Sequence, residues 1–218
     1  MINKPNFIQL LNEKIIVFDG AMGTSIQNCH LNSDDFQGKD GCNEWLVISK
    51  PETIRSIHES FLKAGASVIE TDTFGANEIV LQEYGVADRC YEINLKAAKL
   101  ARDIASDFDS SASPRFVSGS IGPGTKLPSL LQITPESSYK MYTEQICGLI
   151  DGGVDILQIE TCQDMLQMKT AARAAIDMMK EKNKVLPIIL SATFQDNERM
   201  LLGTDIYTLI HTFSLFDI

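Results

Sequence analysis

Short apolar runs rich in β-branched residues alternate along the chain with longer segments in which apolar residues recur at helical spacing. The apolar runs occupy residues 15–24, 66–77, 115–123, 154–162 and 186–194. The helical segments occupy residues 51–66, 91–106, 135–153, 164–182 and 204–216. Each run begins almost continuously apolar, as expected of strands covered on both faces. This order predicts βα units built on a parallel sheet.

Proline and glycine mark the ends of the expected helices. Pro51 and Pro135 stand at first-turn positions, where a residue without an N–H group is tolerated. Gly65 and the pair Gly152 and Gly153 stand where helical segments stop, as glycine does at C-terminal caps. These signals support helices between the apolar runs.

The pattern predicts an α/β fold of the (β/α)8 TIM-barrel type, present as an incomplete barrel of about five βα units. Residues 1–218 are then a single domain, the N-terminal part of a barrel whose strands six to eight are missing. A doubly wound open sheet of five strands is the competing architecture. No G-x-G-x-x-G motif follows the first apolar run, so nothing indicates a dinucleotide site.

Composition and charge narrow the class of ligand. The 218 residues are 44% hydrophobic and 22% charged, as in a globular domain with a core, and the net charge is -10. Such a chain lacks the basic stripe that binds nucleic acids or anionic membranes. The opening "MINKPNFIQLLNEK" has no unbroken apolar core of a signal peptide. We therefore expect a cytoplasmic protein with a small-molecule ligand, no nucleic-acid partner and no membrane association.

The cysteines are five in number and widely spaced: Cys29, Cys42, Cys90, Cys147 and Cys162. An odd count without C-x-x-C spacing predicts neither a disulfide framework nor a zinc knuckle. The three histidines show no H-x-x-H or H-E-x-x-H spacing. We therefore predict no metal ligand among these residues, Cys162 included.

Two acidic residues end apolar runs. Asp19 opens "DGAMGT", where a glycine-rich turn exposes backbone N–H groups that can hold a carboxylate or phosphate, and its own carboxylate can hold an ammonium. A tight βα turn without a ligand is the alternative. Glu160 ends "VDILQIE" beside the core, where a carboxylate is rarely retained without a partner. A substrate ammonium or a lysine or arginine of the barrel is the partner we expect.

The second and third runs also end in chemistry-bearing residues. In "IETDTF", strand alternation sends Glu70 and Asp72 to one side and Thr71 and Thr73 to the other. We expect this cluster, Thr73 included, to line a site at the carboxyl end of the sheet. The segment "GSIGP", residues 119–123, is expected to form a flexible turn at the same end.

In this order the motifs resemble the homocysteine S-methyltransferase family, in its cobalamin-dependent methionine synthase branch. The resemblance rests on "FDGAMGTSIQ", "GCNEWLVISKPETIRSIHESFLKAGASVIETDTFGAN", "GSIGP" and "GGVDILQIET". It extends from about residue 10 to residue 218. The combination is specific, although each motif alone is weak.

The resemblance implies roles for particular residues. It assigns Asp19 and the backbone of Gly20, Ala21 and Met22 to the amino-acid end of homocysteine, with Glu160 holding the ammonium. The catalytic residues stay unassigned. The family commonly has Asn at the position of Asp72, and this chain therefore carries an added acid beside the site.

The resemblance also implies cofactors and partner domains. Family members hold zinc through three cysteine thiolates, and zinc lowers the pKa of the homocysteine thiol. Those thiolates belong to segments after residue 218, so we expect zinc and cobalamin in a full-length parent and neither bound to this chain. The parent reaction transfers a methyl group from methylcobalamin, recharged by methyltetrahydrofolate, to homocysteine. Corrinoid and folate domains are the implied partners, and we expect the isolated chain to be inactive.

Two other functions stay open at this point. One is a non-catalytic amino-acid-binding or regulatory domain that keeps the pocket of Asp19 and Glu160. The other is a homocysteine methyltransferase that uses betaine or S-methylmethionine as donor. An incomplete barrel also leaves the strands at 15–24 and 186–194 as open edges, which predicts self-association.

Overall fold

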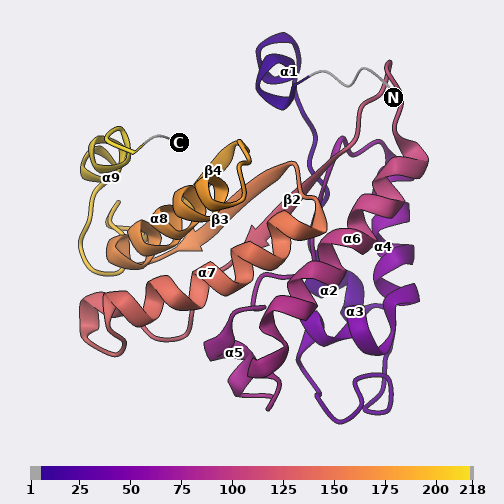
Figure 1. The fold of residues 1–218 in the computed structure, drawn as a ribbon, viewed down its shortest axis with the longest axis horizontal. Coiled ribbons are helices and arrows are strands. Elements are labelled where there is room, and N and C mark those ends of the chain that lie inside the picture. The colour runs from indigo at the N-terminus through magenta and orange to yellow at the C-terminus, as the bar shows by residue number, and fades with distance from the viewer. Residues whose placement is uncertain (1–5, 217–218) are drawn as a thin grey trace.

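A computed structural model describes residues 6–216 and contains a sheet of four parallel strands (Figure 1). The strands are β1 (Val68–Glu70), β2 (Phe116–Ile121), β3 (Ile156–Cys162) and β4 (Ile188–Ala192). Their order in space, β1-β2-β3-β4, is their order along the chain. A doubly wound sheet reverses its strand order part-way, whereas a barrel adds each strand beside the last. The barrel-type α/β fold is therefore confirmed, and the doubly wound alternative is wrong.

The first predicted strand, at residues 15–24, is largely wrong. Only Phe18 forms a bridge, parallel to Val68, and the Asp19 N–H donates to Val68 O at 2.9 Å. The side chains of Ile15 and Val17 are 91% and 54% exposed. Among the described residues, this segment has a sheet neighbour on one side only. Its apolar side chains therefore stay exposed to water, and it forms a single bridge instead of a regular strand. From Met22 the chain is already helical.

The long helices lie where periodicity predicts them, and several short ones were not predicted. The helices are α1 (Phe7–Glu13), α2 (Met22–Gln27), α3 (Leu46–Ser49), α4 (Pro51–Ala64), α5 (Glu78–Gln82), α6 (Cys90–Phe108), α7 (Pro135–Gly152), α8 (Met165–Glu181) and α9 (Ile206–Phe213). Short 3-10 turns span Asn43–Trp45, Ala87–Arg89 and Pro128–Leu130. Consecutive long helices pack against one another, α4 on α6, α6 on α7 and α7 on α8. No helix between residues 6 and 216 combines the length and apolar character that a bilayer span requires.

Local signals explain where the long helices begin and end. Pro51 and Pro135 occupy first-turn positions, and the Thr134 side chain accepts from the Ser137 N–H at the start of α7. Gly65 ends α4 with φ 109°, and Gly153 ends α7 with φ 90°. Only glycine adopts this left-handed backbone without strain, which is why these helices stop there.

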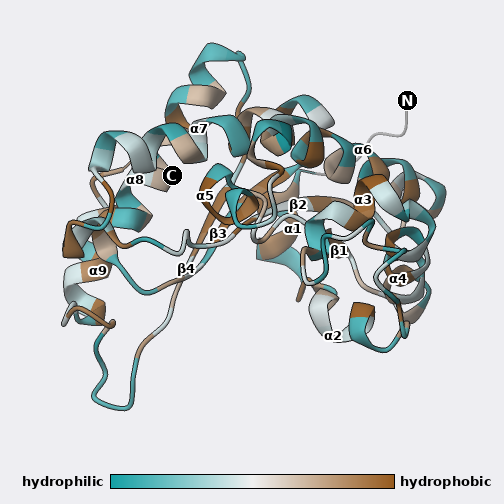
Figure 2. Ribbon diagram, turned by 90° about the horizontal axis from the view of Figure 1, so that it is seen from below, coloured by the Kyte–Doolittle hydropathy of each residue, from teal (hydrophilic) through white to brown (hydrophobic). Residues whose placement is uncertain are grey.

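The core lies between the sheet and the layer formed by α6, α7 and α8, and Figure 2 shows hydrophobic residues along the strands. A smaller cluster closes the other end of the sheet. There Phe7 and Leu10 of α1 pack with Val68, Phe116 and Ile156 near the starts of the strands. The Phe7 and Phe116 rings meet edge to face at 5.3 Å between centroids. Apolar side chains of α1 therefore cover the amino ends of the strands. The polar side chains gather at the carboxyl ends.

Glycine permits close packing of helices on each other and on the sheet. A Cβ at Gly152 would lie 2.4 Å from the Ala98 Cβ, so α7 approaches α6 as closely as backbone allows. Gly119 lies inside β2, where a Cβ would come within 3.0 Å of Leu149 Cδ1. The prediction of a flexible turn at 119–123 is therefore wrong for its first three residues, which are buried strand.

The substitution Gly152→Ala is expected to destabilise the fold. The added methyl must displace Ala98 or separate α6 from α7, which costs about 1–3 kcal/mol in a packed core. Chemical denaturation of both proteins measures the loss. Gly23→Ala is the matched control, because a Cβ there meets nothing closer than Asn43 Nδ2 at 3.8 Å. Equal stability of wild type and Gly152→Ala would contradict the packing argument.

The isolated chain is expected to self-associate through β4. Among residues 6–216, β4 pairs with β3 on one side and with no strand on the other. Unpaired strand edges recruit further strands, so sedimentation velocity should show an average mass that rises with concentration. Ser191→Lys adds a charge at an exposed position of that strand and should reduce the effect. A wild-type monomer at every concentration would exclude edge pairing.

Candidate ligand-binding cavity

A cavity of about 360 Å³ opens at the carboxyl ends of the strands. Its lining consists of Asp19, Gly20, Ala21, Met22, Gly23, Asn43, Glu44, Glu70, Thr71, Asp72, Thr73, Phe74, Ser120 and Glu160. All six residues expected to contact the substrate are among them: Asp19, Gly20, Ala21, Met22, Thr73 and Glu160. The sheet therefore gathers these predicted residues in one place, although their binding roles stay predictions.

Asp19 joins residues 15–19, which we call the first segment, to β1. Its carboxylate accepts the Glu70 N–H, with both oxygens at 3.1 Å, and its own N–H donates to Val68 O. These contacts continue the sheet pattern by one residue beyond the Phe18 bridge. The chain then turns through Gly20 and Ala21 into α2, so the turn lies against the same cavity as the carboxylate.

Glu160 reaches the cavity from an irregular part of β3. Pairing between β3 and β4 shifts register between Ile159 and Cys162, and Thr161 adopts a left-handed φ of 58°. Such bulges reorient side chains and are common beside functional sites. The Ser120 hydroxyl donates to the Glu160 carboxylate and fixes its position.

Glu70 was predicted only as a member of a lining cluster, and it is a central part of the site. The Gln158 side chain donates from Nε2 to Glu70 Oε1 at 2.6 Å. This contact links β1 to β3 across β2, which carries only Ser118, Gly119 and Ser120 at that level. The small residues of β2 leave room for the longer side chains of its neighbours to meet.

Burial and mutual repulsion raise the pKa values of two of these carboxyl groups. Burial raises the pKa of Asp19 to about 8, with the Glu70 N–H opposing the shift and the charges of Glu70 and Glu160 adding to it. Burial and the Glu160 charge raise the pKa of Glu70 to about 7, while the Gln158 hydrogen bond opposes. The free protein therefore holds protons here near neutral pH.

The two threonines of "TDTF" form a fixed scaffold. Their hydroxyl oxygens, on Thr71 and Thr73, lie 2.6 Å apart, as alternation predicts for one face. Thr73 donates to Ser120 O at 2.7 Å, and Thr71 Oγ1 accepts the Ser120 N–H at 3.0 Å. The hydroxyl proton of Thr73 is thus directed to the backbone of β2, and a ligand would meet Thr73 chiefly as an acceptor.

Asp72 does not join Glu70, although the two acids were expected on one side. Asp72 faces Glu44, which follows Asn43 in a 3-10 turn that carried no periodic signal. Burial and the neighbouring Glu44 charge raise the pKa of Asp72 far above its usual range. Burial also raises the pKa of Glu44. The cavity therefore has two acidic parts, one around Asp19 and one around Asp72.

The charge balance of the lining indicates the kind of ligand that it fits. Five of the lining residues carry carboxyl groups, and none is a lysine, arginine or histidine. The expectation that Glu160 pairs with a basic residue of the barrel is therefore not met within this lining. Buried carboxylates without a counterion favour a ligand that brings a positive charge.

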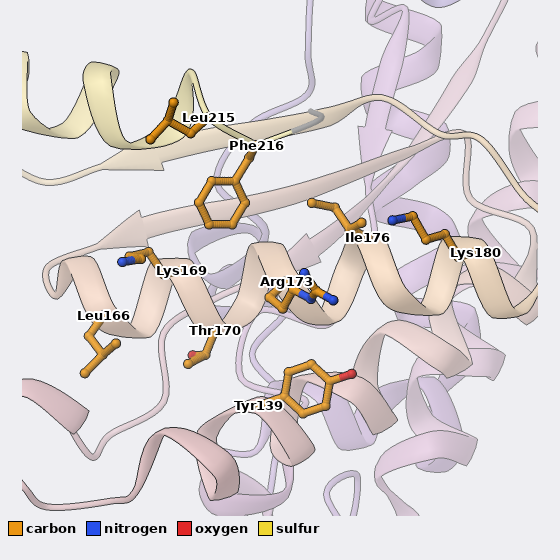
Figure 3. Close-up of a pocket in the computed structure, with 9 residues that line it drawn as sticks. All are labelled: Tyr139, Leu166, Lys169, Thr170, Arg173, Ile176, Lys180, Leu215 and Phe216. Carbon is orange, nitrogen blue, oxygen red and sulfur yellow. The ribbon is translucent and has the colours of Figure 1, made fainter.

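A second cavity, of about 530 Å³, lies along α8 and shares no lining residue with the first (Figure 3). Figure 3 shows the Phe216 ring pointing toward α8 and Tyr139 of α7 approaching from the opposite side. Its charged lining residues, Lys169, Arg173 and Lys180, are all basic. It lacks the convergent acids of the first cavity.

The comparisons with known proteins bear on this site. The family model described as "Homocysteine S-methyltransferase" matches residues 16–216, which includes every residue of the acidic cavity. The chain belongs to the homocysteine S-methyltransferase family. Within this family the position of the cavity, at the carboxyl ends of barrel strands, is where barrel enzymes carry their active sites.

Curated relatives in the homocysteine S-methyltransferase family include two mycobacterial methionine synthases. The chain is 39% identical to that of Mycobacterium tuberculosis and 37% identical to that of Mycobacterium leprae, each over 201 residues. These matches span 92% of this chain and 17% of each relative. The chain therefore corresponds to about a sixth of the length of these relatives.

Solved structures support the barrel-type fold. The Escherichia coli homocysteine methyltransferase MmuM in its metallated form superposes with a TM-score of 0.76 at 21% identity, over 94% of this chain and 73% of that one. Its oxidised form gives the same TM-score at 22% identity. At this level of identity the likeness establishes the fold.

The described residues do not fit the metal that the family implies. Between residues 6 and 216, no group of three or more His, Cys, Asp and Glu side chains is arranged to hold a metal ion. Burial raises the pKa values of Cys42 and Cys162 to about 12 and also raises that of Cys90, so these thiols are neutral in the metal-free protein.

The free energy of unfolding is expected to fall as the pH rises from about 4 to 8. Asp19 keeps its proton to about pH 8 in the folded chain but loses it near 3.8 when unfolded, so the folded state binds more protons throughout this interval. Asp19→Asn should therefore stabilise the free chain at pH 8, by on the order of 5 kcal/mol, with little effect near pH 4. Denaturation at several pH values measures this. A difference independent of pH would contradict the raised pKa.

Proposed function

We propose that the acidic cavity binds the amino-acid end of homocysteine and that the chain is the homocysteine-binding portion of a methionine synthase-type enzyme. The observation that carries the proposal is a cavity with five carboxyl groups and no basic residue, in a chain of the homocysteine S-methyltransferase family. An α-amino acid brings the ammonium that this lining lacks.

The ammonium of homocysteine lies among Asp19, Glu70 and Glu160 in this proposal. Glu70 and Glu160 come from the ends of β1 and β3, and Asp19 comes from the segment bridged to β1. All three are held by neutral donors, which position them without neutralising them. A bound ammonium stabilises the ionised forms of Asp19 and Glu70 and lowers their raised pKa values. Binding near pH 7 therefore releases protons from Asp19 and Glu70.

The carboxylate of homocysteine lies toward the turn into α2. Gly20, Ala21 and Met22 line the cavity there, and no side chain accepts hydrogen bonds from the cap of this helix. Backbone N–H groups suit an anion in a site that has no basic side chain. The two ends of the amino acid are thereby fixed, which orients the thiol for reaction.

The relatives are described as methionine synthases, which supports methionine as the product of the whole enzyme. In the proposed enzyme, a cobalamin cofactor recharged by methyltetrahydrofolate would supply the methyl group that homocysteine accepts. This chain contributes substrate binding and orientation. Activation of the thiol by zinc and the corrinoid and folate modules belong to the proposed enzyme as a whole and not to the residues described above.

Calorimetric titration of the chain with homocysteine tests the proposal. Asp19→Asn and Glu160→Gln should each weaken binding by about tenfold or more, because each removes a charged partner of the ammonium. Glu181→Gln, at the exposed end of α8, is the matched control and should bind like wild type. N-acetylhomocysteine, which lacks the ammonium, should not bind.

Proton release gives a second, independent check. Titrations near pH 7 in buffers of different ionisation enthalpy should show heats that report release of protons on binding, and Asp19→Asn should release fewer. Binding of N-acetylhomocysteine as tightly as homocysteine would show that the acids do not recognise an ammonium, and the assignment would then fall.

A further inference from the structure

Asp72 is the acidic residue of the cavity that the proposed ammonium site does not use. Its side chain is 6% exposed, and the Oδ2 atom is buried without a hydrogen-bond partner among the described residues. A buried ionised carboxylate in this state is strongly disfavoured, whereas the neutral acid is tolerated. Asp72 also lines the cavity, so its carboxyl group borders the space that a ligand would enter.

Glu44 is the neighbouring acid, and its surroundings differ from those of Asp72. Glu44 Oε1 accepts the Gly75 N–H at 2.7 Å, and the Cys42 thiol lies 3.9 Å from Oε2. Donors stabilise the ionised form of a carboxyl group. When one proton is available to the two acids, it therefore resides on Asp72, the acid without donors.

The position of Asp72 places it near the turn into α2. A Cβ built on Gly23 lies 3.8 Å from Asn43 Nδ2, so the 3-10 turn that carries Glu44 adjoins the start of α2. Asp72 is close enough to Glu44 for the Glu44 charge to act on it. Asp19 and Glu70 instead interact with each other and with Glu160. Asp72 therefore lies on the side of the cavity assigned to the carboxylate of the ligand.

We propose that Asp72 is a protonated, neutral acid in the working protein and donates a hydrogen bond from its carboxyl O–H to the carboxylate of the bound amino acid. The inference rests on the proposed function and extends it by naming a specificity-determining residue. Of the polar groups of homocysteine, the ammonium only donates and the thiol accepts weakly, so the carboxylate is the acceptor that an O–H donor fits. A cavity without lysine or arginine must use neutral donors for this purpose.

The charged and titratable groups that face Asp72 are compatible with this role. They are Glu44, whose charge disfavours a second anion beside it, and Cys42, whose thiol is held in its neutral form by burial and by the Glu44 charge. Tyr84 adjoins Cys42 and Glu44 and is neutral, since burial raises its pKa. Among residues 6–216, no group facing Asp72 supplies the positive charge that would ionise it.

Two substitutions distinguish a neutral Asp72 that donates a hydrogen bond from an ionised Asp72 that accepts one. Asp72→Asn keeps the shape and offers an N–H donor that does not titrate, so it should bind homocysteine as wild type does near pH 7. As the pH rises it should lose less affinity than wild type, because its amide does not ionise as Asp72 does, whereas loss of the ligand ammonium affects both proteins alike. Asp72→Ala removes the donor and should weaken homocysteine binding by about tenfold.

A ligand control assigns the effect to the carboxylate. 3-Aminopropane-1-thiol has the ammonium and thiol of homocysteine but no carboxylate. Its affinity should be the same for wild type and Asp72→Ala, whereas Glu160→Gln should weaken it. Loss of homocysteine binding in Asp72→Asn as large as in Asp72→Ala would overturn the proposal, because an ionised acceptor would then be the form that matters.

Infrared difference spectroscopy of the free chain reads the proton directly. Wild type minus Asp72→Asn at neutral pH should contain the carbonyl stretching band of a protonated carboxylic acid. A carboxylate band in its place would overturn the proposal. If no form of the chain binds homocysteine, the proposed function fails and the assignment of a ligand to Asp72 fails with it, while the infrared band still decides its protonation. Binding of homocysteine by wild type with no effect of Asp72→Ala would overturn the present inference alone.

Discussion

The candidate site depends on one constraint: its carboxyl groups lie close together in the cavity and no basic side chain of the lining balances their charge. The lining holds five carboxyl groups and no basic side chain. Backbone and neutral side-chain donors position three of them, Asp19 through the Glu70 N–H, Glu70 through Gln158 and Glu160 through Ser120. Because neutral donors do not remove the repulsion, the free protein reduces it by keeping protons. A bound proton and a ligand ammonium therefore each reduce the same repulsion between the carboxylates.

The parallel sheet makes this concentration of charge inevitable once acids follow the strands. All strand ends meet at one edge, so residues distant in sequence, such as Asp19 and Glu160, become neighbours. The middle strand β2 contributes small residues, which lets Gln158 of β3 reach Glu70 of β1. The opposite end of the sheet is closed by apolar packing of α1. The amino ends of the strands thus carry apolar packing that stabilises the fold, and the carboxyl ends carry the polar groups of the cavity.

Sequence reasoning predicted those features that depend on local pattern. The long helices and the order of the βα units follow from periodicity, and Asp19 and Glu160 stand out because each ends an apolar run. The first strand was wrong because its pairing depends on neighbours and not on its own apolar residues. Glu44 was missed because it lies in a short turn and reaches the cavity through a contact with Gly75, 31 residues away. The separation of Asp72 from Glu70 likewise depends on distant neighbours, since Asp72 lies beside Glu44 and Glu70 contacts Gln158.

The hydrogen bond between the Asp19 carboxylate and the Glu70 N–H has a consequence for the protein in a cell. The same carboxylate fastens the first segment to the sheet and faces the cavity, so a ligand that neutralises it also secures that segment. A ligand bound only by the folded state shifts the folding equilibrium in its favour. Scarcity of the metabolite would leave the segment easier to release and the chain more open to proteolysis. The supply of the proposed ligand would then govern how long the protein survives.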